Sequence, residues 1–186
     1  MSDQTIKLTA DVVALAEYDG VTWILLIQRD DEPYTGCWAL PGGHVDTGEE
    51  ADDAARRELA EETDVTVNHS DLTPMGAYHA IGRDPRGRYV TIAYLTEFEG
   101  HLPQATAADD ARKAEWIPID RVFSRILDPL PLAFDHGQII QEALLGDYPK
   151  PSTTNSTNAD SPVVNVNHGG SVGIQAGHIH DRRINL

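Results

Sequence analysis

The chain has 186 residues and a formal net charge of −16, and this charge lies on residues 1–150, because the few charged residues after position 150 cancel. So acidic a surface repels nucleic acid and anionic membranes, which argues against either as a partner, whereas a small phosphorylated ligand stays compatible because bound cations reverse the local field. The single cysteine, Cys37, excludes an internal disulfide, and the polar N-terminus lacks the basic and apolar regions of a signal peptide, so the sequence predicts a cytoplasmic protein.

Apolar, β-branched segments predict strands in the first third of the chain and again near residue 90. The two strongest are Lys7–Tyr18 and 21–29, joined by an Asp-Gly turn. Pro41-Gly42-Gly43 is expected to end a short extended segment and to form a tight turn, whose carbonyl groups can approach a cation. The remaining predictions are strands at 65–68, 72–81, 88–98 and 114–117, a short helix at 119–126 and a longer helix at 133–145.

A helix is expected to follow Thr47-Gly48-Glu49-Glu50, which fits a capping box. In that arrangement the Thr47 hydroxyl caps the first turn while Glu50 reaches back to the backbone. The apolar stripe of the helix, which should face the core, consists of Ala51, Ala54, Ala55 and Leu59.

Three carboxylates of this helix, on Glu58, Glu61 and Glu62, share one face because their spacing is i, i+3, i+4. Like charges so close together destabilise a helix, and a hard divalent cation such as Mg²⁺ or Mn²⁺ reverses that effect because it prefers clustered carboxylate oxygens. The face therefore predicts a metal site for a phosphate-bearing substrate. The competing interpretation is a solvated acidic helix, since charge runs usually face water.

The stretch from Gly43 to Val65 resembles the Nudix box. That pattern is Gly, five residues, Glu, seven residues, Arg-Glu, an aliphatic residue, any residue, Glu-Glu, any residue, Gly and an aliphatic residue. Asp64 stands where the family has its second glycine, and we expect a left-handed backbone there, which Asp tolerates better than most residues. The residues that match in register are Gly43, Glu49, Arg57, Glu58, Leu59, Glu61, Glu62 and Val65.

The resemblance covers roughly residues 8–147 and implies an α+β fold, an α/β/α sandwich around a mixed sheet with the box helix packed against it. The irregular order of strands and helices points the same way. Segments 84–88, 109–111 and 132–136 resemble ADP-ribose pyrophosphatases in particular. The predicted organisation is a Nudix hydrolase domain at 1–147, a polar linker at 148–162 and a C-terminal tail at 163–186, which is either a β-hairpin or disordered.

Spacing and resemblance together imply that Glu58, Glu61 and Glu62 hold the metal with help from the Gly43 carbonyl, and that Arg57 orients them. The base that activates water is either Glu62 or an acid beside the loop 100–111, where solvated acids without a role are an equal alternative. The predicted catalytic set is Glu61, Glu62, Arg57 and Asp110, with Asp109 and Glu99 as further candidates for the base, and the predicted substrate contacts are Arg29, Gly42, His44, Arg86 and Arg88.

The expected activity is metal-dependent cleavage of a diphosphate linked to a nucleoside, with Mg²⁺ or Mn²⁺ as cofactor. ADP-ribose is the favoured substrate and would give AMP and ribose 5-phosphate. The alternatives are a pyrophosphohydrolase of nucleoside triphosphates or dinucleoside polyphosphates, and a non-catalytic ADP-ribose sensor. A homodimer stays open, and the candidates for stacking on the base are Trp23, Tyr34, Trp38, Tyr78 and Tyr94.

Overall fold

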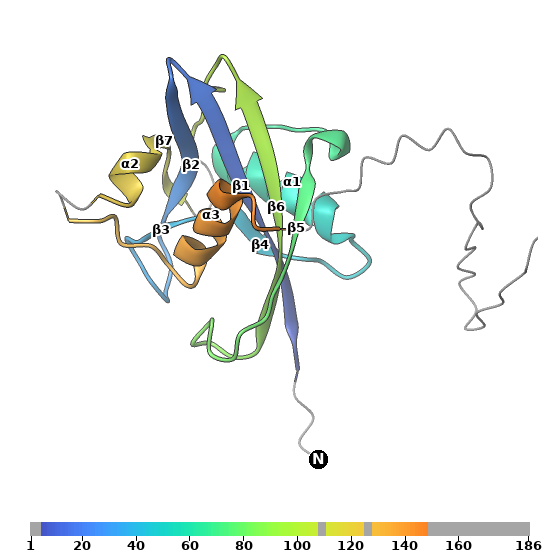
Figure 1. The fold of residues 1–186 in the computed structure, drawn as a ribbon. Coiled ribbons are helices and arrows are strands. Elements are labelled where there is room, and N and C mark those ends of the chain that lie inside the picture. Colours follow the sequence, from blue (N-terminus) through green and yellow to red (C-terminus); the bar gives the residue numbers. More distant parts are fainter. Residues whose placement is uncertain (1–4, 108–110, 125–127, 149–186) are drawn as a thin grey trace, which may run out of the picture. The chain divides into compact units, whose positions relative to one another are not determined.

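A mixed β-sheet forms the centre of the protein (Figure 1). The computed structural model describes residues 5–107, 111–124 and 128–148. The elements in chain order are β1 (Lys7–Tyr18), β2 (Val21–Arg29), β3 (Trp38–Ala39), β4 (Gly42–His44), α1 (Ala51–Thr63), the 3-10 helix η1 (His69–Asp71), β5 (Thr73–Tyr78), β6 (Tyr89–Glu99), β7 (Ala111–Pro118), α2 (Ile119–Val122) and α3 (His136–Leu145). The strand order is β3-β2-β1-β6-β5, with β4 paired to β1 and β7 paired to β2. Only the β1–β6 pair is parallel among these described strands.

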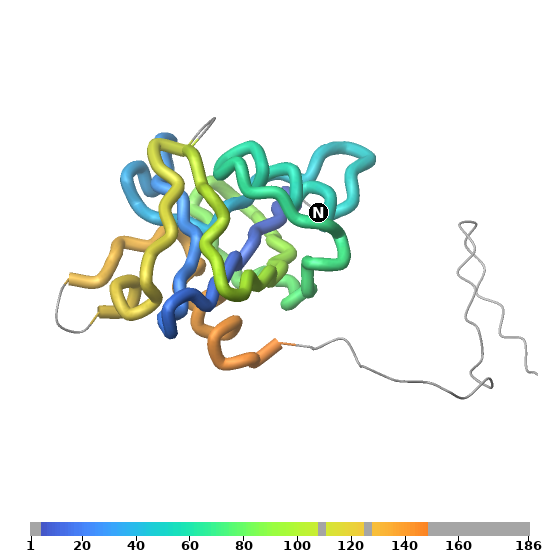
Figure 2. The backbone as a smooth tube through the Cα atoms, turned by 90° about the horizontal axis from the view of Figure 1, so that it is seen from above, coloured from blue at the N-terminus to red at the C-terminus, as the bar shows by residue number. Residues whose placement is uncertain are grey.

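Strand β1 is buried on both faces because helices cover the sheet from both sides. Val12 and Ala14 pack with α1 in one apolar cluster, whereas Val13 and Leu15 pack with α3 in another. This alternation follows from the two-residue period of a strand. Figure 2 shows α1 and α3 on opposite sides of the strands. The predicted α+β fold, an α/β/α sandwich with a mixed sheet, is confirmed.

Helix α1 begins without the predicted capping box. Its N-cap is Glu50, and no side chain forms a cap hydrogen bond there. Glu49 Oε2 instead accepts a hydrogen bond from the Asp46 backbone N–H at 2.9 Å, which closes the loop before the helix. The Thr47 prediction is wrong because the helix starts four residues after Thr47, too far for its hydroxyl to reach the first turn.

The end of α1 matches its prediction. Asp64 is left-handed, with φ of 60°, and its backbone N–H is bonded to the Ala60 carbonyl at 2.9 Å. An Asp at the glycine position of the box therefore keeps the helix end that a glycine would form.

Two predictions about segments beside α1 are wrong. Gly42 and Gly43 do not form a turn but lie in β4, which pairs antiparallel with β1. Residues 65–68 form no strand in the described part of the chain, although Val65 and Val67 are buried in the cluster under α1. Alternating apolar residues indicate burial of every second side chain, and an irregular segment anchored at two valines produces the same pattern as a strand.

The C-terminal helices are shorter than predicted, since α2 ends at Val122 and α3 starts at His136. None of the helices in the described ranges is long and apolar enough to cross a membrane. The predicted tail at 163–186, and the linker apart from Tyr148, lie outside the described residues and stay predictions.

Candidate functional site

A cavity of about 390 Å³ lies against β4 and α1. Its walls come from β1, from the end of β2 and the loop that follows it, from the segment that leads into β6, and from the start of α3 with the residues just before it. The cavity brings together most of the predicted site residues, namely Arg29, Gly42, Gly43, His44, Arg57, Glu58, Glu62 and Arg86.

Arg57 is the centre of the hydrogen-bond network on α1. Its Nε and Nη2 donate to the two carboxylate oxygens of Glu49 at 2.8 and 2.9 Å, which is a bidentate contact. Nη1 donates to Glu58 at 2.8 Å and to Glu61 at 3.0 Å, and Nη2 also donates to the His44 carbonyl at 3.0 Å. One guanidinium group therefore ties the loop before the helix, two box glutamates and β4 into a single arrangement.

Glu62 is buried at the cavity wall and is only 8% exposed. Its Oε2 accepts a hydrogen bond from the Gly42 backbone N–H at 2.8 Å. Burial raises the pKa of Glu62 to about 8; the Gly42 bond opposes this, and the Glu58 and Asp11 carboxylates add to it. Burial also raises the pKa of Glu58, against the effect of Arg57. Burial therefore disfavours the ionised forms of both acids.

Among the residues with described positions, no three or more His, Cys, Asp or Glu side chains are gathered as a metal-binding cluster. The box glutamates accept the hydrogen bonds given above. Their chemistry nevertheless fits a hard divalent cation, which prefers carboxylate and carbonyl oxygens. Gly43 also leaves room beside the acids, because a Cβ there would come within 3.0 Å of the Glu58 carboxylate. A cation would favour the ionised form of Glu62, which burial alone disfavours.

Two guanidinium groups lie over the ring of Phe134, Arg29 at 5.1 Å and Arg86 at 5.6 Å from its centroid. Arg86 is also 4.8 Å from the ring centroid of Tyr89. Each guanidinium group also donates hydrogen bonds within the protein. Arg29 donates to carbonyl groups of the loop after β2, and Arg86 donates to the Asp84 carboxylate at 2.7 Å. Aromatic faces and fixed hydrogen bonds together hold these cations in place for an anionic ligand.

Two of the predicted residues, Glu61 and Arg88, do not line this cavity, and the position of a third is not described. Glu61 is exposed and reaches the site only through Arg57. Arg88 donates to the carbonyl groups of His79 and Ala80, within the loop between β5 and β6. Asp110 lies outside the described residues. The candidate stacking aromatics Trp23, Tyr34, Trp38, Tyr78 and Tyr94, like Glu99, are also absent from the cavity lining, whose aromatic rings are His44, Tyr89, Phe134 and His136.

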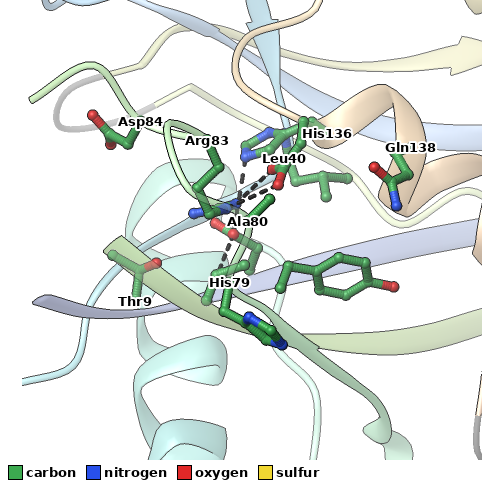
Figure 3. Close-up of polar contacts among 12 residues, drawn as sticks. Thr9, Leu40, His79, Ala80, Arg83, Asp84, His136 and Gln138 are labelled. Carbon is green, nitrogen blue, oxygen red and sulfur yellow. Dashed lines mark hydrogen bonds and ion pairs between the residues drawn. The ribbon is translucent and has the colours of Figure 1, made fainter. Parts of the chain in front are cut away.

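Several lining residues had no predicted role, namely Asp11, Arg83, Asp84, Phe134 and His136. Arg83 forms a bidentate contact with Asp135 at 2.9 and 2.6 Å, which joins the loop before β6 to the start of α3. Figure 3 shows Arg83 and His136 close together there. Segments 84–88 and 132–136 carried a family resemblance, and Asp11 is the one acid in the first ten residues of β1. An acid in a strand buried on both faces was the signal that could have identified it.

Replacing Arg57 by Lys is expected to lower kcat/KM for the diphosphate hydrolysis that the sequence predicts by about 10- to 100-fold. The reason is that Lys keeps the charge but cannot hold several carboxylates in a fixed geometry. The apparent metal affinity should fall with it. Steady-state kinetics over a range of Mg²⁺ concentrations checks this. Arg56→Lys is the matched control, since Arg56 lies on the same helix but contacts Val67 and Asp53 away from the cavity. Equal effects of the two changes would contradict the role given to Arg57.

A family model described as "NUDIX domain" matches residues 6–143 of the chain. The chain is similar to an ADP-ribose pyrophosphatase of Methanocaldococcus jannaschii, with 39% identity over 120 residues that cover 64% of each protein. It is also similar to the ADPR responsive transcriptional repressor NtrR of Acinetobacter baylyi, with 32% identity over 140 residues, 73% of this chain and 52% of the relative. The matched part is thus less than two thirds of either relative's length.

Solved structures give the same fold. The NUDIX domain of Shewanella oneidensis NrtR, complexed with ADP ribose, matches with a TM-score of 0.70 and 29% identity, over 78% of this chain and 90% of that one. A bifunctional NMN adenylyltransferase/ADP ribose pyrophosphatase of Francisella tularensis, complexed with AMP and a manganese ion, matches with a TM-score of 0.69 and 30% identity, over 78% and 43%. The family model that matches residues 6–143 shows that the chain belongs to the NUDIX domain family, and Arg57, Glu58 and Glu62 of its box lie around one cavity.

Proposed function

We propose that this chain is a metal-dependent hydrolase that cleaves the diphosphate of ADP-ribose to give AMP and ribose 5-phosphate. The observation that carries the proposal is that the buried Glu62 and the partly buried Glu58 lie beside fixed arginines in one cavity. The substrate is supported by the names of the archaeal and Francisella relatives and by the ADP ribose bound to the Shewanella domain.

Glu58, Glu61 and Glu62, with the Gly43 carbonyl, are the groups that would hold Mg²⁺ or Mn²⁺. Such a cation neutralises a diphosphate and lowers the pKa of water. The oxygen-only donor set supports either cation, and the manganese in the Francisella structure supports the second. Arg57 keeps Glu58 and Glu61 in orientation through the hydrogen bonds from its Nη1.

Arg29 and Arg86 are proposed to bind the diphosphate, since both line the cavity and neither Nη1 atom donates to any described residue. The water that attacks phosphorus has to lose a proton to a carboxylate within reach. Glu62 faces the cavity and can accept that proton, and Asp110 stays the predicted alternative. Gly42 fixes the Glu62 carboxylate through its backbone N–H, which leaves the other oxygen for this task.

A sensor without turnover is the second candidate, because the Acinetobacter relative is named as a repressor that responds to ADPR. We favour the enzyme, since all three box glutamates lie on α1 and Arg57 donates hydrogen bonds to two of them, Glu58 and Glu61. The net charge of −16 supports the proposal that this chain itself does not bind nucleic acid or membranes. The single cysteine supports a cytoplasmic location.

Hydrolysis of a substrate panel tests the proposal. Purified protein is incubated with Mg²⁺ or Mn²⁺ and with ADP-ribose, ATP or a diadenosine polyphosphate, and the products are separated by chromatography. We expect the highest kcat/KM for ADP-ribose, with AMP and ribose 5-phosphate in equal amounts. A higher kcat/KM for ATP or for the diadenosine compound would replace ADP-ribose as the substrate.

A further inference from the structure

Asp11 and His136 face each other in the cavity without forming a hydrogen bond. His136 Nε2 lies 3.9 Å from Asp11 Oδ2, and the two side chains are only 4% and 9% exposed. Both residues line the cavity. A separation of 3.9 Å is too long for a hydrogen bond, so these two buried groups face each other without a hydrogen bond between them.

The hydrogen bond from Leu40 determines which nitrogen of His136 carries the proton. The Leu40 backbone N–H donates to Nδ1 at 2.9 Å, so Nδ1 must offer its lone pair (Figure 3). A neutral imidazole that accepts at Nδ1 carries its proton on Nε2. Burial also lowers the pKa of His136, which agrees with a neutral ring. His136 therefore presents an N–H donor to the cavity, and no described residue accepts from it.

Asp11 presents the complementary acceptor. Its Oδ2 already accepts a hydrogen bond from the Thr91 hydroxyl at 2.6 Å, which holds the carboxylate in position on β1. A carboxylate oxygen has a second lone pair for another donor. An oxygen atom that sits between Asp11 and His136 must therefore accept from the imidazole and donate to the carboxylate.

We propose that Asp11 and His136 form a subsite for a hydroxyl group, and that this subsite selects a nucleotide whose diphosphate ends in a sugar over one that ends in a phosphate. A hydroxyl group both donates and accepts. A terminal phosphate oxygen can accept from His136, but at neutral pH it has no proton for Asp11 and brings a like charge beside that carboxylate. The inference rests on the proposed function, because it explains how the same cavity would distinguish ADP-ribose from a nucleoside polyphosphate.

Calorimetric binding of ADP-ribose and ADP tests the subsite, since both ligands contain ADP, and ADP lacks the terminal ribose and carries an additional negative charge in its place. EDTA is present to prevent turnover. We expect the wild-type protein to bind ADP-ribose more tightly than ADP. In Asp11→Asn, ADP-ribose affinity should fall about tenfold, while ADP affinity stays equal or rises, because a charged acceptor is lost and a like charge is removed.

His136→Asn serves as the second variant, because its amide oxygen can still accept from Leu40 while the Nε2–H is lost. It should weaken ADP-ribose binding by a similar factor. Asp46→Asn removes an equal charge from the exposed rim of the same cavity and should leave the ADP-ribose to ADP ratio unchanged. Thermal melting confirms that each variant is folded.

Two outcomes overturn the subsite. One is a wild-type protein that binds ADP at least as tightly as ADP-ribose, and the other is a ratio in Asp11→Asn that stays within about twofold of wild type. The proposed function fails in a different way, since a protein that prefers ADP-ribose through Asp11 but does not hydrolyse it would keep the subsite and lose the enzymatic activity.

Discussion

Replacing Glu62 by Gln is expected to lower kcat/KM for ADP-ribose about a hundredfold or more, and also to stabilise the metal-free protein at alkaline pH. The activity is lost because an uncharged amide neither binds a hard cation well nor accepts a proton from water. The fold should survive, since the amide oxygen of Gln can still accept the Gly42 N–H, as Glu62 does at 2.8 Å.

The gain in stability follows from the raised pKa of Glu62. Its ordinary value is 4.5 and burial raises it to about 8, so the folded protein holds a proton that the unfolded chain has already lost between these pH values. The stabilisation from this group is fully present below pH 4.5 and is lost as pH rises through 8. The loss is up to about 1.4 kcal/mol for each pH unit in that window. Gln stays neutral and removes this dependence.

Urea unfolding in EDTA at several pH values between 5 and 9 measures the effect. The curves of wild type and Glu62→Gln should diverge as pH rises, with the variant more stable. Glu61→Gln is the matched control, because Glu61 is exposed and its replacement should change the free energy of unfolding by only about 0.5 kcal/mol. Parallel curves for wild type and Glu62→Gln would contradict the burial of an ionisable group at this position.

Replacing Gly42 by Ala is expected to lower the free energy of unfolding by about 3 kcal/mol or more. A Cβ at this position would come within 3.0 Å of backbone atoms of Ala10 and Asp11 on β1, and it would lie 2.7 Å from the Asp11 Cα. Backbone atoms of a central strand cannot move aside as a flexible side chain can. The strand β4 would have to separate from β1, and the Gly42 N–H would leave the Glu62 carboxylate.

Gly48→Ala separates this clash from the backbone cost of losing a glycine. Gly48 has φ of +87°, and a Cβ added there would meet no described atom within 4 Å, so its replacement costs only about 1 kcal/mol from the unfavourable backbone conformation. Chemical denaturation of both variants gives the comparison. If Gly42→Ala lost no more stability than Gly48→Ala, the close approach of β4 to β1 would be wrong.

The sequence predicted the strands that are long and regular. Strands β1 and β2 begin and end where the apolar segments do, because each is buried and bounded by polar turns. The positions of short elements such as β4 depend on tertiary contacts instead. Gly42 and Gly43 have the composition of a turn, yet both extend along β1. A Cβ at Gly42 would clash with Ala10 and Asp11 of that strand, and a Cβ at Gly43 would clash with the Glu58 carboxylate. Local propensity carries no information about such a neighbour.

The residues of the candidate site fall into the same two groups, those predicted by local sequence and those positioned by tertiary packing. The spacing of Glu58, Glu61 and Glu62 on one helix is a local property, so it could be read from the sequence. Phe134 and His136 join the cavity from a segment about seventy residues after the end of the box at Val65, and their position depends on how α3 packs on the sheet. The aromatic candidates failed for this reason, since Trp38 and Tyr94 fill the core instead of the cavity.

Turnover of ADP-ribose by the 186-residue protein is the measurement that tests the central proposal most directly. ADP-ribose is supplied in large molar excess with Mg²⁺ or Mn²⁺, and AMP and ribose 5-phosphate are counted per protein molecule, with EDTA as the parallel sample. The account predicts many turnovers with the cation and none in EDTA. Tight binding of ADP-ribose with no product in either sample would contradict it and identify the cavity as the binding site of a sensor.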